Sequence, residues 1–282
     1  MGIGTGIFLI SQITAKPDFV PEKIETLDYK VFEQEKSIAY TLTIPNHQLY
    51  TIRPFVAPTI ISVAQAAKQT QALAAINAGY FDPINQKTTS IVVIDGREIA
   101  TPKENERLMN NPNLSSYLPS ILNRSEFRIY LCNKKVVYEI AIHSAPTPTN
   151  CQLRHAMGGG PQLLPIDTAQ QEGFTDYANG TLIRDAIGSQ QPNARTAIGL
   201  KADGSVVWVM ISQKKGANSS GMTLEDLANF MHSLGVQAAL NLDGGSSASL
   251  FYKGQAIYGK RNDSGQPIER EVKSVLLLFG VF

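Results

Sequence analysis

Charged residues and histidines are scarce in this sequence. Of 282 residues, 17% are charged, four are histidine and the formal net charge is +1. A globular domain typically carries about a quarter charged residues, so this composition excludes long charged tails. Lysine and arginine form no basic patch, since Lys134-Lys135 and Lys214-Lys215 are only pairs, of the kind found in solvated turns. We therefore expect no nucleic-acid partner.

No apolar run reaches the roughly 20 residues that a membrane-spanning helix needs. An uncharged, largely apolar segment extends from Gly2 to Ala15, without the basic start of a signal peptide. Residues 1–15 are either the remnant of an export signal or anchor, or a first buried strand. Lys16-Pro17-Asp18 ends the run as a mature N-terminus would, which favours export. We expect a secreted, periplasmic or membrane-anchored protein, with membrane association through this segment only.

Only two cysteines occur, Cys132 and Cys151. A disulfide between them would contribute roughly 3 kcal/mol in the chain-entropy model. In a reducing compartment they would instead be two buried thiols, and their spacing does not decide between these states. The sequence has no CxxC pair and no tight cluster of histidine and aspartate, so we expect no metal site and no cofactor.

The remaining sequence is rich in strand patterns. Apolar residues make up 43%, enough for a sizeable core. Strands are predicted in residues 28–53, at 127–132 and 136–142, and at 196–200 and 206–212. Helices are predicted at 59–71 and after the capping residues Thr223 and Asp226, and a long surface loop at 101–120. We expect an α+β fold: a mixed, largely antiparallel β-sheet core with a few packed helices in one large domain, residues 20–282.

Residues 241–247, Asn-Leu-Asp-Gly-Gly-Ser-Ser, follow the predicted buried strand 238–240. Gly244 and Gly245 permit close approach of a ligand, and consecutive N–H groups there would form an anion-binding nest. Asp243 would serve as base, nucleophile or metal ligand, while the simpler interpretation is a tight turn. The segment lacks the final glycine of a G-x-S-x-G nucleophile elbow, and Gly158-Gly159-Gly160-Pro161 lacks the lysine of a P-loop.

Other polar residues also sit beside predicted buried strands. Asn77 begins Asn-Ala-Gly-Tyr-Phe, in which the amide suits sugar hydroxyls and Tyr80 a pyranose face, whereas Phe81 reads as a core anchor. Arg195 abuts an apolar strand and needs a partner. A guanidinium grips phosphate with two parallel hydrogen bonds, so Arg195 and Arg270 are candidate phosphate ligands. For Arg270 the alternative is a salt bridge to a neighbouring glutamate.

In this order and spacing, the segments at 77–81, 158–162, 195–199, 221–227 and 241–247 resemble the phosphodiester glycosidase domain. That domain occurs in the enzyme that uncovers mannose 6-phosphate and in bacterial exported proteins linked to exopolysaccharide. The resemblance covers about residues 60–282. It implies hydrolysis of a sugar-1-phosphodiester to a sugar and a phosphomonoester. Its catalytic residues would be Asp243, Arg195 and Asn77. The expected substrate-binding residues are Gly79, Tyr80, Gly159, Gly160, Thr196, Asn241, Gly244, Gly245, Ser246, Ser247 and Arg270.

Two departures from the family pattern, Ala78 and Ser247, bear on sugar selectivity. The expected partner is a small or polymeric sugar phosphate. Two other functions remain open: a non-catalytic binder of phosphorylated glycans, and a metal-dependent phosphodiesterase that cuts on the phosphate side with Asp243 as a ligand. Turnover of a sugar-1-phosphodiester distinguishes the first, and chelator sensitivity the second.

Overall fold

The computed structural model describes residues 1, 26–46, 49–217 and 219–281. Strands make up 46% of the described residues and helices 14%, mostly in antiparallel sheets, so the predicted α+β single domain is confirmed. The apolar segment predicted at residues 1–15 lies outside the described residues, apart from Met1. Within the described ranges, no helix is both long enough and apolar enough to cross a membrane.

The first sheet has six antiparallel strands, and two of its central strands are largely buried. In order across the sheet they are β1 (Asp28–Glu33), β2 (Ser37–Ile44), β14 (Val206–Gln213), β13 (Arg195–Lys201), β15 (Val236–Leu242) and β10 (Gln162–Leu164). β13 and β14 are buried along nearly their whole length because both faces of the sheet are covered. Their apolar sequences are what a strand with two covered faces requires.

The second sheet packs face to face on the first. Its five strands, in order, are β17 (Gln255–Tyr258), β16 (Ser249–Tyr252), β4 (Ala74–Asn77), β18 (Val272–Gly280) and β3 (Tyr50–Ile61). The largest core cluster joins the two sheets, with Leu42, Ile198 and Trp208 from the first and Ile76 and Leu276 from the second. The result is a β-sandwich in which the main core lies between the sheets.

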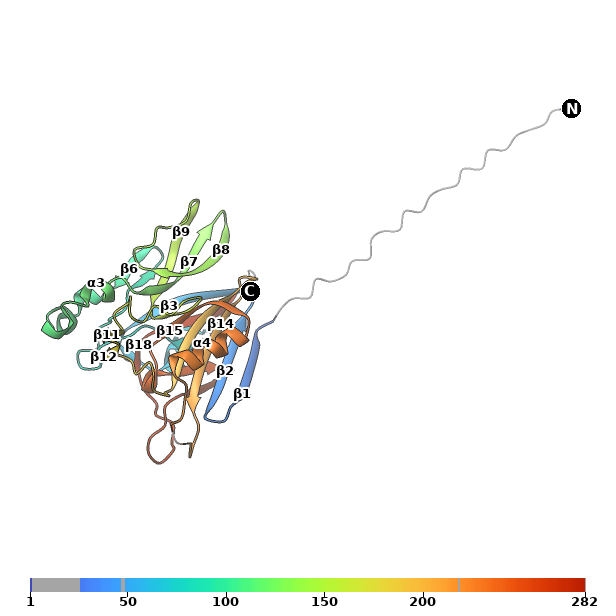
Figure 1. Ribbon diagram of the computed structural model, residues 1–282. Helices are drawn as coiled ribbons and strands as arrows, with labels where there is room; N and C mark the ends of the chain where they lie inside the picture. The colour runs from blue at the N-terminus through green and yellow to red at the C-terminus, as the bar shows by residue number, and fades with distance from the viewer. Residues whose placement is uncertain (2–25, 47–48, 218, 282) are drawn as a thin grey trace.

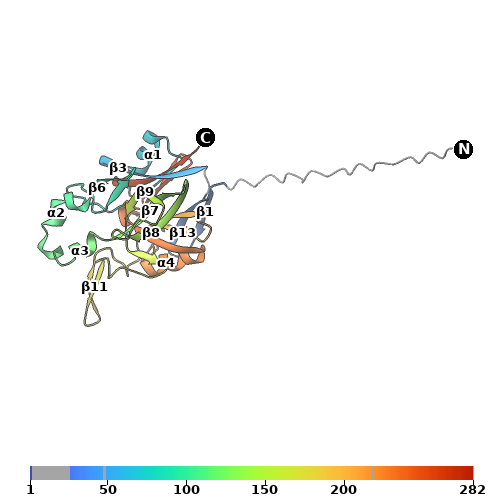
Figure 2. The same cartoon turned by 90° about the horizontal axis from the view of Figure 1, so that it is seen from above.

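One long helix covers the outer face of each sheet. α4 (Leu224–Ser233) packs Leu227 and Met231 on the first sheet, and α1 (Val63–Thr70) packs Val63 and Ala66 on the second. Figure 1 shows α4 lying over the first sheet, and Figure 2 shows α1 and α4 on opposite sides of the sandwich. The short helical segments are η1 (Pro102–Glu104), α2 (Glu106–Met109), η2 (Pro112–Leu114), α3 (Leu118–Ile121) and η3 (Gly245–Ser247).

One helix prediction and one loop prediction need correction. The helix expected at 59–71 starts only at Val63, because β3 continues through Ile61 and Ser62 caps the helix with its side chain, paired with Gln65 in a capping box. The loop expected at 101–120 is instead a series of short helical turns. Asparagine side chains cap two of them, since Asn105 and Asn111 each accept a hydrogen bond from a backbone N–H.

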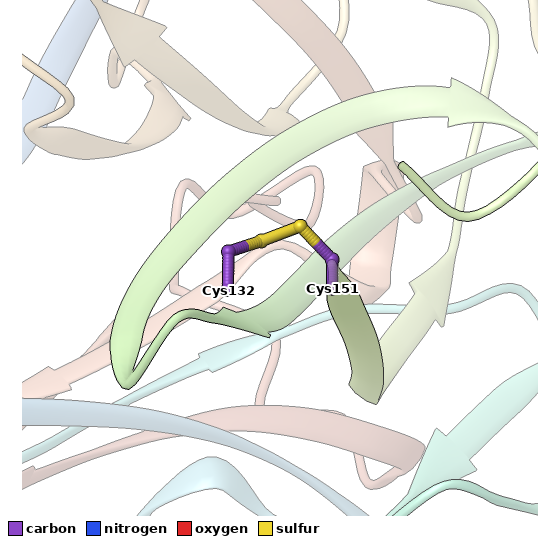
Figure 3. Close-up of a disulfide and its surroundings, with 2 residues drawn as sticks. All are labelled: Cys132 and Cys151. Atoms are coloured by element: carbon purple, nitrogen blue, oxygen red, sulfur yellow. A yellow bond between two sulfur atoms is a disulfide. The ribbon is translucent and has the colours of Figure 1, made fainter. Parts of the chain in front are cut away.

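A third sheet packs one face on the same core through Phe127 and Met157. Its strands, in order, are β6 (Arg97–Ala100), β5 (Val92–Ile94), β9 (Cys151–Gly158), β7 (Ser125–Cys132) and β8 (Lys135–Ile142), and β11 (Thr175–Ala178) and β12 (Thr181–Asp185) form a separate hairpin. Cys132 and Cys151 are directly paired across β7 and β9 and form a disulfide (Figure 3). Strand pairing thus decides the state that the spacing left open.

Candidate active site

Four strand ends meet at one place, and the predicted site segments lie there. β4, β9 and β15 finish at this edge and β13 begins there, because β13 runs antiparallel to β15 with Thr196 opposite Leu242. Asn77, Gly158 and Asp243 are thereby brought together from three sheets. The antiparallel topology, rather than closeness in sequence, assembles the site.

Asn77 lies at the centre of this junction and is fully buried. Its Nδ2 donates to the main-chain carbonyl of Asp243 at 2.5 Å. Its Oδ1 accepts from Thr196 Oγ1 at 2.8 Å and from Ser249 N at 3.0 Å. The amide therefore ties four segments together, and both Asn77 and Thr196 lie behind the surface that a substrate could touch.

Asp243 follows β15 and is partly exposed. Its N–H donates to Ala78 O at 2.9 Å, which fixes the backbone at the point where the side chain leaves the sheet. Burial raises the pKa of the Asp243 carboxyl to about 6. Hydrogen bonds from Ser247 and from the Gly244 N–H, together with the charge of Arg270, lower the pKa and offset part of the rise. A carboxyl with this pKa is mostly ionised at neutral pH and only weakly hydrated, which suits a nucleophile or base.

The turn after Asp243 differs from the expected anion nest. The Gly244 N–H is directed at the Asp243 carboxylate, and the Gly245 N–H donates to Ala194 O at 2.8 Å. Gly245 has φ +59, and a Cβ on Gly244 would lie 2.9 Å from Ala194 O, so close packing as well as conformation calls for glycine. These two N–H groups are used inside the protein and shape the turn.

Two serines of this turn have different partners. Ser246 is partly exposed, and its Oγ accepts from Arg270 Nη1 at 2.9 Å. Ser247 is 3% exposed and contacts the Asp243 carboxyl, so it holds that group rather than facing solvent. The Arg270 guanidinium lies 5.5 Å from the Phe81 ring centroid, and among the described residues no glutamate forms a salt bridge with it. Arg270 is thus available to an anion beside Asp243.

The Gly158–Pro161 loop lines the other side of the junction. Gly159 is buried, and a Cβ there would lie 2.7 Å from Asn241 O. Gly160 has φ +109, its N–H donates to Asn241 O, and its carbonyl accepts from Tyr80 Oη at 2.8 Å. Close approach to the Asn241 backbone accounts for Gly159, and the positive φ accounts for Gly160. Gly79 is also buried, and a Cβ there would lie 2.8 Å from the Ser90 side chain.

Tyr80 and Asn241 form a hydrogen-bonded pair at the base of the site. Asn241 Nδ2 donates to Tyr80 Oη at 2.6 Å and to Gly160 O at 3.1 Å. Asn241 is 2% exposed, and its Oδ1 has no partner among the described residues. Burial, followed by the charge of Asp243, raises the pKa of Tyr80, so its hydroxyl stays protonated and donates to Gly160. Its hydroxyl is therefore occupied within the protein, and its ring packs against the Phe174 ring with centroids 5.6 Å apart.

Arg195, predicted as a phosphate ligand, is buried in this structure and its guanidinium binds main-chain carbonyls. It is 2% exposed, and its guanidinium donates to four main-chain carbonyls: Met222 at 3.0 Å, Ile187 at 3.0 Å, Gly188 at 2.5 Å and Gln191 at 2.7 Å. Burial lowers its pKa. Arg195 therefore anchors residues 187–191 beside the site, with its hydrogen-bonding capacity largely taken up by the backbone.

Sequence reasoning missed several residues of this region. Glu172 is 2% exposed and accepts from Ser125 N and Oγ, from Gln162 N and from the Thr168 hydroxyl. It fixes the Gly158–Pro161 loop from behind. Asn193 and Lys260, which hydrogen-bond each other at 3.1 Å next to the Gly245 turn, were also missed. No motif marks any of the three.

The structure also bears on metal binding. Over the described ranges, no three or more histidine, cysteine, aspartate or glutamate side chains come together as a metal-binding group. Asp243 is accompanied instead by Ser247 and Arg270. Hydrogen-bond donors and a cation, rather than further carboxylates, surround the carboxyl.

This arrangement, a β-sandwich with one carboxyl at the exit of a buried strand and a cation beside it, defines a candidate glycosidase-type site. The family model described as phosphodiester glycosidase matches residues 70–279. The chain belongs to the phosphodiester glycosidase family, as the resemblance of its motifs predicted. Among curated proteins, no match was found.

Solved structures with the same fold are distant in sequence. A hypothetical protein from Synechocystis is 17% identical with a TM-score of 0.60, over 90% of this chain and 62% of that one. The catalytic domain of zebrafish N-acetylglucosamine-1-phosphodiester alpha-N-acetylglucosaminidase, auto-inhibited by its pro-peptide, is 17% identical with a TM-score of 0.62, over 90% and 82%. A Burkholderia pseudomallei protein described as exported is 16% identical with a TM-score of 0.60, over 86% and 74%. At these identities the likeness shows a shared fold.

Proposed function

We propose that this protein hydrolyses sugar-1-phosphodiester bonds, releasing the sugar and leaving a phosphomonoester. The observation that carries the proposal is the Asp243 carboxyl, partly exposed at the end of β15 with a pKa raised to about 6 by burial. Family membership supports the reaction class, because the matched family is that of phosphodiester glycosidases. The proposed substrate is a glycan or cell-envelope polymer outside the cytoplasm.

The reaction follows from the chemistry of the leaving group. The Asp243 carboxylate, or a water that it deprotonates, attacks the anomeric carbon, and the bond from that carbon to the phosphate oxygen breaks. The electron pair leaves with the phosphate, which becomes a monoester whose second pKa is about 6. Such an anion departs without protonation by a general acid, so one carboxylate suffices where a typical glycosidase uses two.

Attack by the Asp243 carboxylate and attack by a water that Asp243 deprotonates release sugars of different anomeric configuration. Direct attack forms a glycosyl ester on Asp243, which water then hydrolyses, and the sugar keeps its anomeric configuration. Activation of water inverts the configuration in a single step. The anomer released first, followed by magnetic resonance before mutarotation, therefore decides whether Asp243 is nucleophile or base.

The groups around Asp243 suit the two halves of the substrate. Arg270, which forms no salt bridge with any glutamate in the described part of the chain, would bind the phosphate through charge-assisted hydrogen bonds. The partly exposed Tyr80 would face the sugar, and the buried Asn241 holds its hydroxyl from behind. A binding module would use the same groups, so turnover is the observation that separates an enzyme from a binder.

A screen of sugar-1-phosphodiesters with product identification tests the proposal. We expect free sugar and a phosphomonoester from the wild type, and loss of at least about a thousandfold in kcat for Asp243→Asn. The exposed Asp28→Asn, on the edge strand β1, is the matched control and should retain activity. In isotopically labelled water the label should enter the sugar. Label in the phosphate, or full activity of folded Asp243→Asn, would contradict the mechanism.

Export is a second part of the proposal. One structural relative is described as exported, and the Cys132–Cys151 disulfide is of a kind that persists in oxidising compartments. Fractionation of cells that produce the full chain tests this part. Recovery of the protein in the cytoplasm with free thiols would contradict it.

A further inference from the structure

A second cation lies next to the proposed site. Lys260 is half-buried, and its Nζ donates to Asn193 Oδ1 at 3.1 Å. Among the described residues it forms no salt bridge with a carboxylate. A half-buried ammonium gives up part of its hydration, and one neutral acceptor compensates for little of that loss. The positive charge of Lys260 is therefore not neutralised by the protein, and an anion could bind it.

Asn193 places Lys260 against the catalytic turn. Its Oδ1 also accepts from Ala194 N at 2.9 Å, and its backbone forms two hydrogen bonds with Met222, so the side chain is held in one orientation. In that orientation Nδ2 lies 3.7 Å from the position that a Cβ on Gly245 would occupy. This leaves Nδ2 as a donor beside the turn, next to the Lys260 ammonium.

Arg270 forms a hydrogen bond with Ser246, the residue that follows Gly245 in the same turn. Gly245 lies against Asn193, whereas the Ser246 Oγ accepts from Arg270. Donor groups therefore contact two consecutive residues of the turn, Gly245 and Ser246, which lie two and three positions after Asp243. Arg270 is also one of the groups that lower the pKa of Asp243.

We propose, on the basis of the proposed function, that Lys260 is a substrate-binding residue that pairs with the phosphate together with Arg270, and that Asn193 positions it. The phosphate changes charge in the reaction, from one negative charge as a diester toward two as a monoester above pH about 6. A second cation stabilises this gain, which is larger in the transition state and product than in the substrate.

The surroundings leave room for the rest of the substrate. The chain neighbours of the pair, Pro192 and Arg261, line a cleft of about 640 Å³ that also contains Lys214 and Lys215. A phosphate held by Lys260 would have its non-sugar substituent on this side. The main chain at Lys260 is held without the side chain, because Ile268 N donates to Lys260 O at 2.8 Å, so replacement of the side chain should leave the fold intact.

The test compares Lys260→Met with Lys260→Arg and with the exposed control Lys253→Met, using a sugar-1-phosphodiester and a neutral aryl glycoside of the same sugar. We expect Lys260→Met to lose about 10- to 100-fold in kcat/KM on the phosphodiester, the size of one charge-assisted hydrogen bond. Lys260→Arg should keep most activity, and the neutral substrate should change less than threefold. Inorganic phosphate, titrated by calorimetry, should bind Lys260→Met about tenfold more weakly than the wild type.

The experiment distinguishes an error in the assignment of Lys260 from an error in the proposed function. If Lys260→Met keeps kcat/KM and phosphate affinity within twofold of the wild type, Lys260 is not a phosphate ligand, although hydrolysis would stand. Equal losses on charged and neutral substrates would also overturn the assignment, because they indicate a structural role. If the wild type does not turn over any phosphodiester, the phosphate titration alone decides whether Lys260 binds the anion.

Discussion

The Nδ2 of Asn77 donates a hydrogen bond of 2.5 Å to the main-chain carbonyl of Asp243. The two residues are 166 positions apart: Asn77 ends β4 in one sheet, and Asp243 directly follows β15 of another. The bond joins the backbone that presents the candidate catalytic carboxyl to the facing sheet. Asn77, expected as a catalytic residue, thus has a geometric role in this structure, because it is fully buried and its amide is occupied within the protein.

Asn77→Ala should destabilise the fold by about 3 kcal/mol or more, because it leaves the carbonyl of Asp243, the hydroxyl of Thr196 and the N–H of Ser249 without their partner. Thr196→Val, which removes one of these bonds, should cost about 1 kcal/mol. Urea unfolding of the two variants measures both. Equal stability of Asn77→Ala and wild type would show that the junction does not depend on this amide.

Arg195 is expected to act on the loop rather than on phosphate. Arg195→Met should destabilise the protein by roughly 3 kcal/mol and expose residues 186–192 to limited proteolysis, because the four carbonyls that the guanidinium holds become unpaired. Arg195→Lys should also release the loop, since an ammonium cannot span four carbonyls. A variant that is stable and protease-resistant but has a raised KM would instead identify Arg195 as a phosphate ligand.

Much of this fold could be predicted from local sequence pattern. Alternating residues at 38–44, a turn at Asp203-Gly204 and the capping residues Thr223 and Asp226 each correspond to the observed β2, β13–β14 hairpin and α4. These signals are local, because side-chain periodicity and caps are set within a few residues. The position of Asp243 at a strand exit was predictable for the same reason.

Long-range partners could not be predicted in this way. Glu172 stands in a polar run that reads as exposed, yet it is buried because donors from β7, from β10 and from Thr168 converge on it. The burial of Arg195 was foreseeable from its apolar strand, but its partners are carbonyls of a loop that has no distinctive sequence. Asn193 and Lys260 are 67 residues apart, and only the folded sheets bring them together.

The pKa of Asp243 predicts the acid limb of the pH–rate profile. Because the ionised carboxyl is the reactive form, kcat/KM should rise with pH through about 6 and level off above it. Ser247→Ala removes a hydrogen bond that lowers this pKa, so the limb should move to higher pH. A phosphodiester does not titrate in this range, so an acid limb near pH 4 in the wild type would contradict the assignment.

The same pKa shift implies that the ionised Asp243 carboxylate lowers the free energy of unfolding. Its folded-state pKa of about 6 lies above the ordinary 3.8, so the folded protein binds the proton more tightly and loses stability as pH rises between these values. The difference corresponds to about 3 kcal/mol at pH 7.5. At pH 7.5, Asp243→Asn should raise the free energy of unfolding by about 1–3 kcal/mol, reduced by the hydrogen bonds that the carboxylate loses. Below pH 4 the carboxyl is protonated in both the folded and the unfolded state, so no gain is expected. Urea unfolding at both pH values measures this, and a less stable Asp243→Asn at pH 7.5 would contradict it.

The disulfide should affect stability and leave catalysis alone. Cys132 and Cys151 close a segment of 19 residues, so the double serine variant should lose about 3 kcal/mol in the chain-entropy model. Cys151 begins β9 and Gly158 ends it, which separates the bond from the site by roughly 23 Å of extended strand. The variant should therefore unfold at lower urea concentration with kcat within about twofold of the wild type. Addition of reductant to the wild type should lower its midpoint equally, and the variant, which has no bond to reduce, is the control. An unchanged wild-type midpoint would show that the bond is not formed in solution.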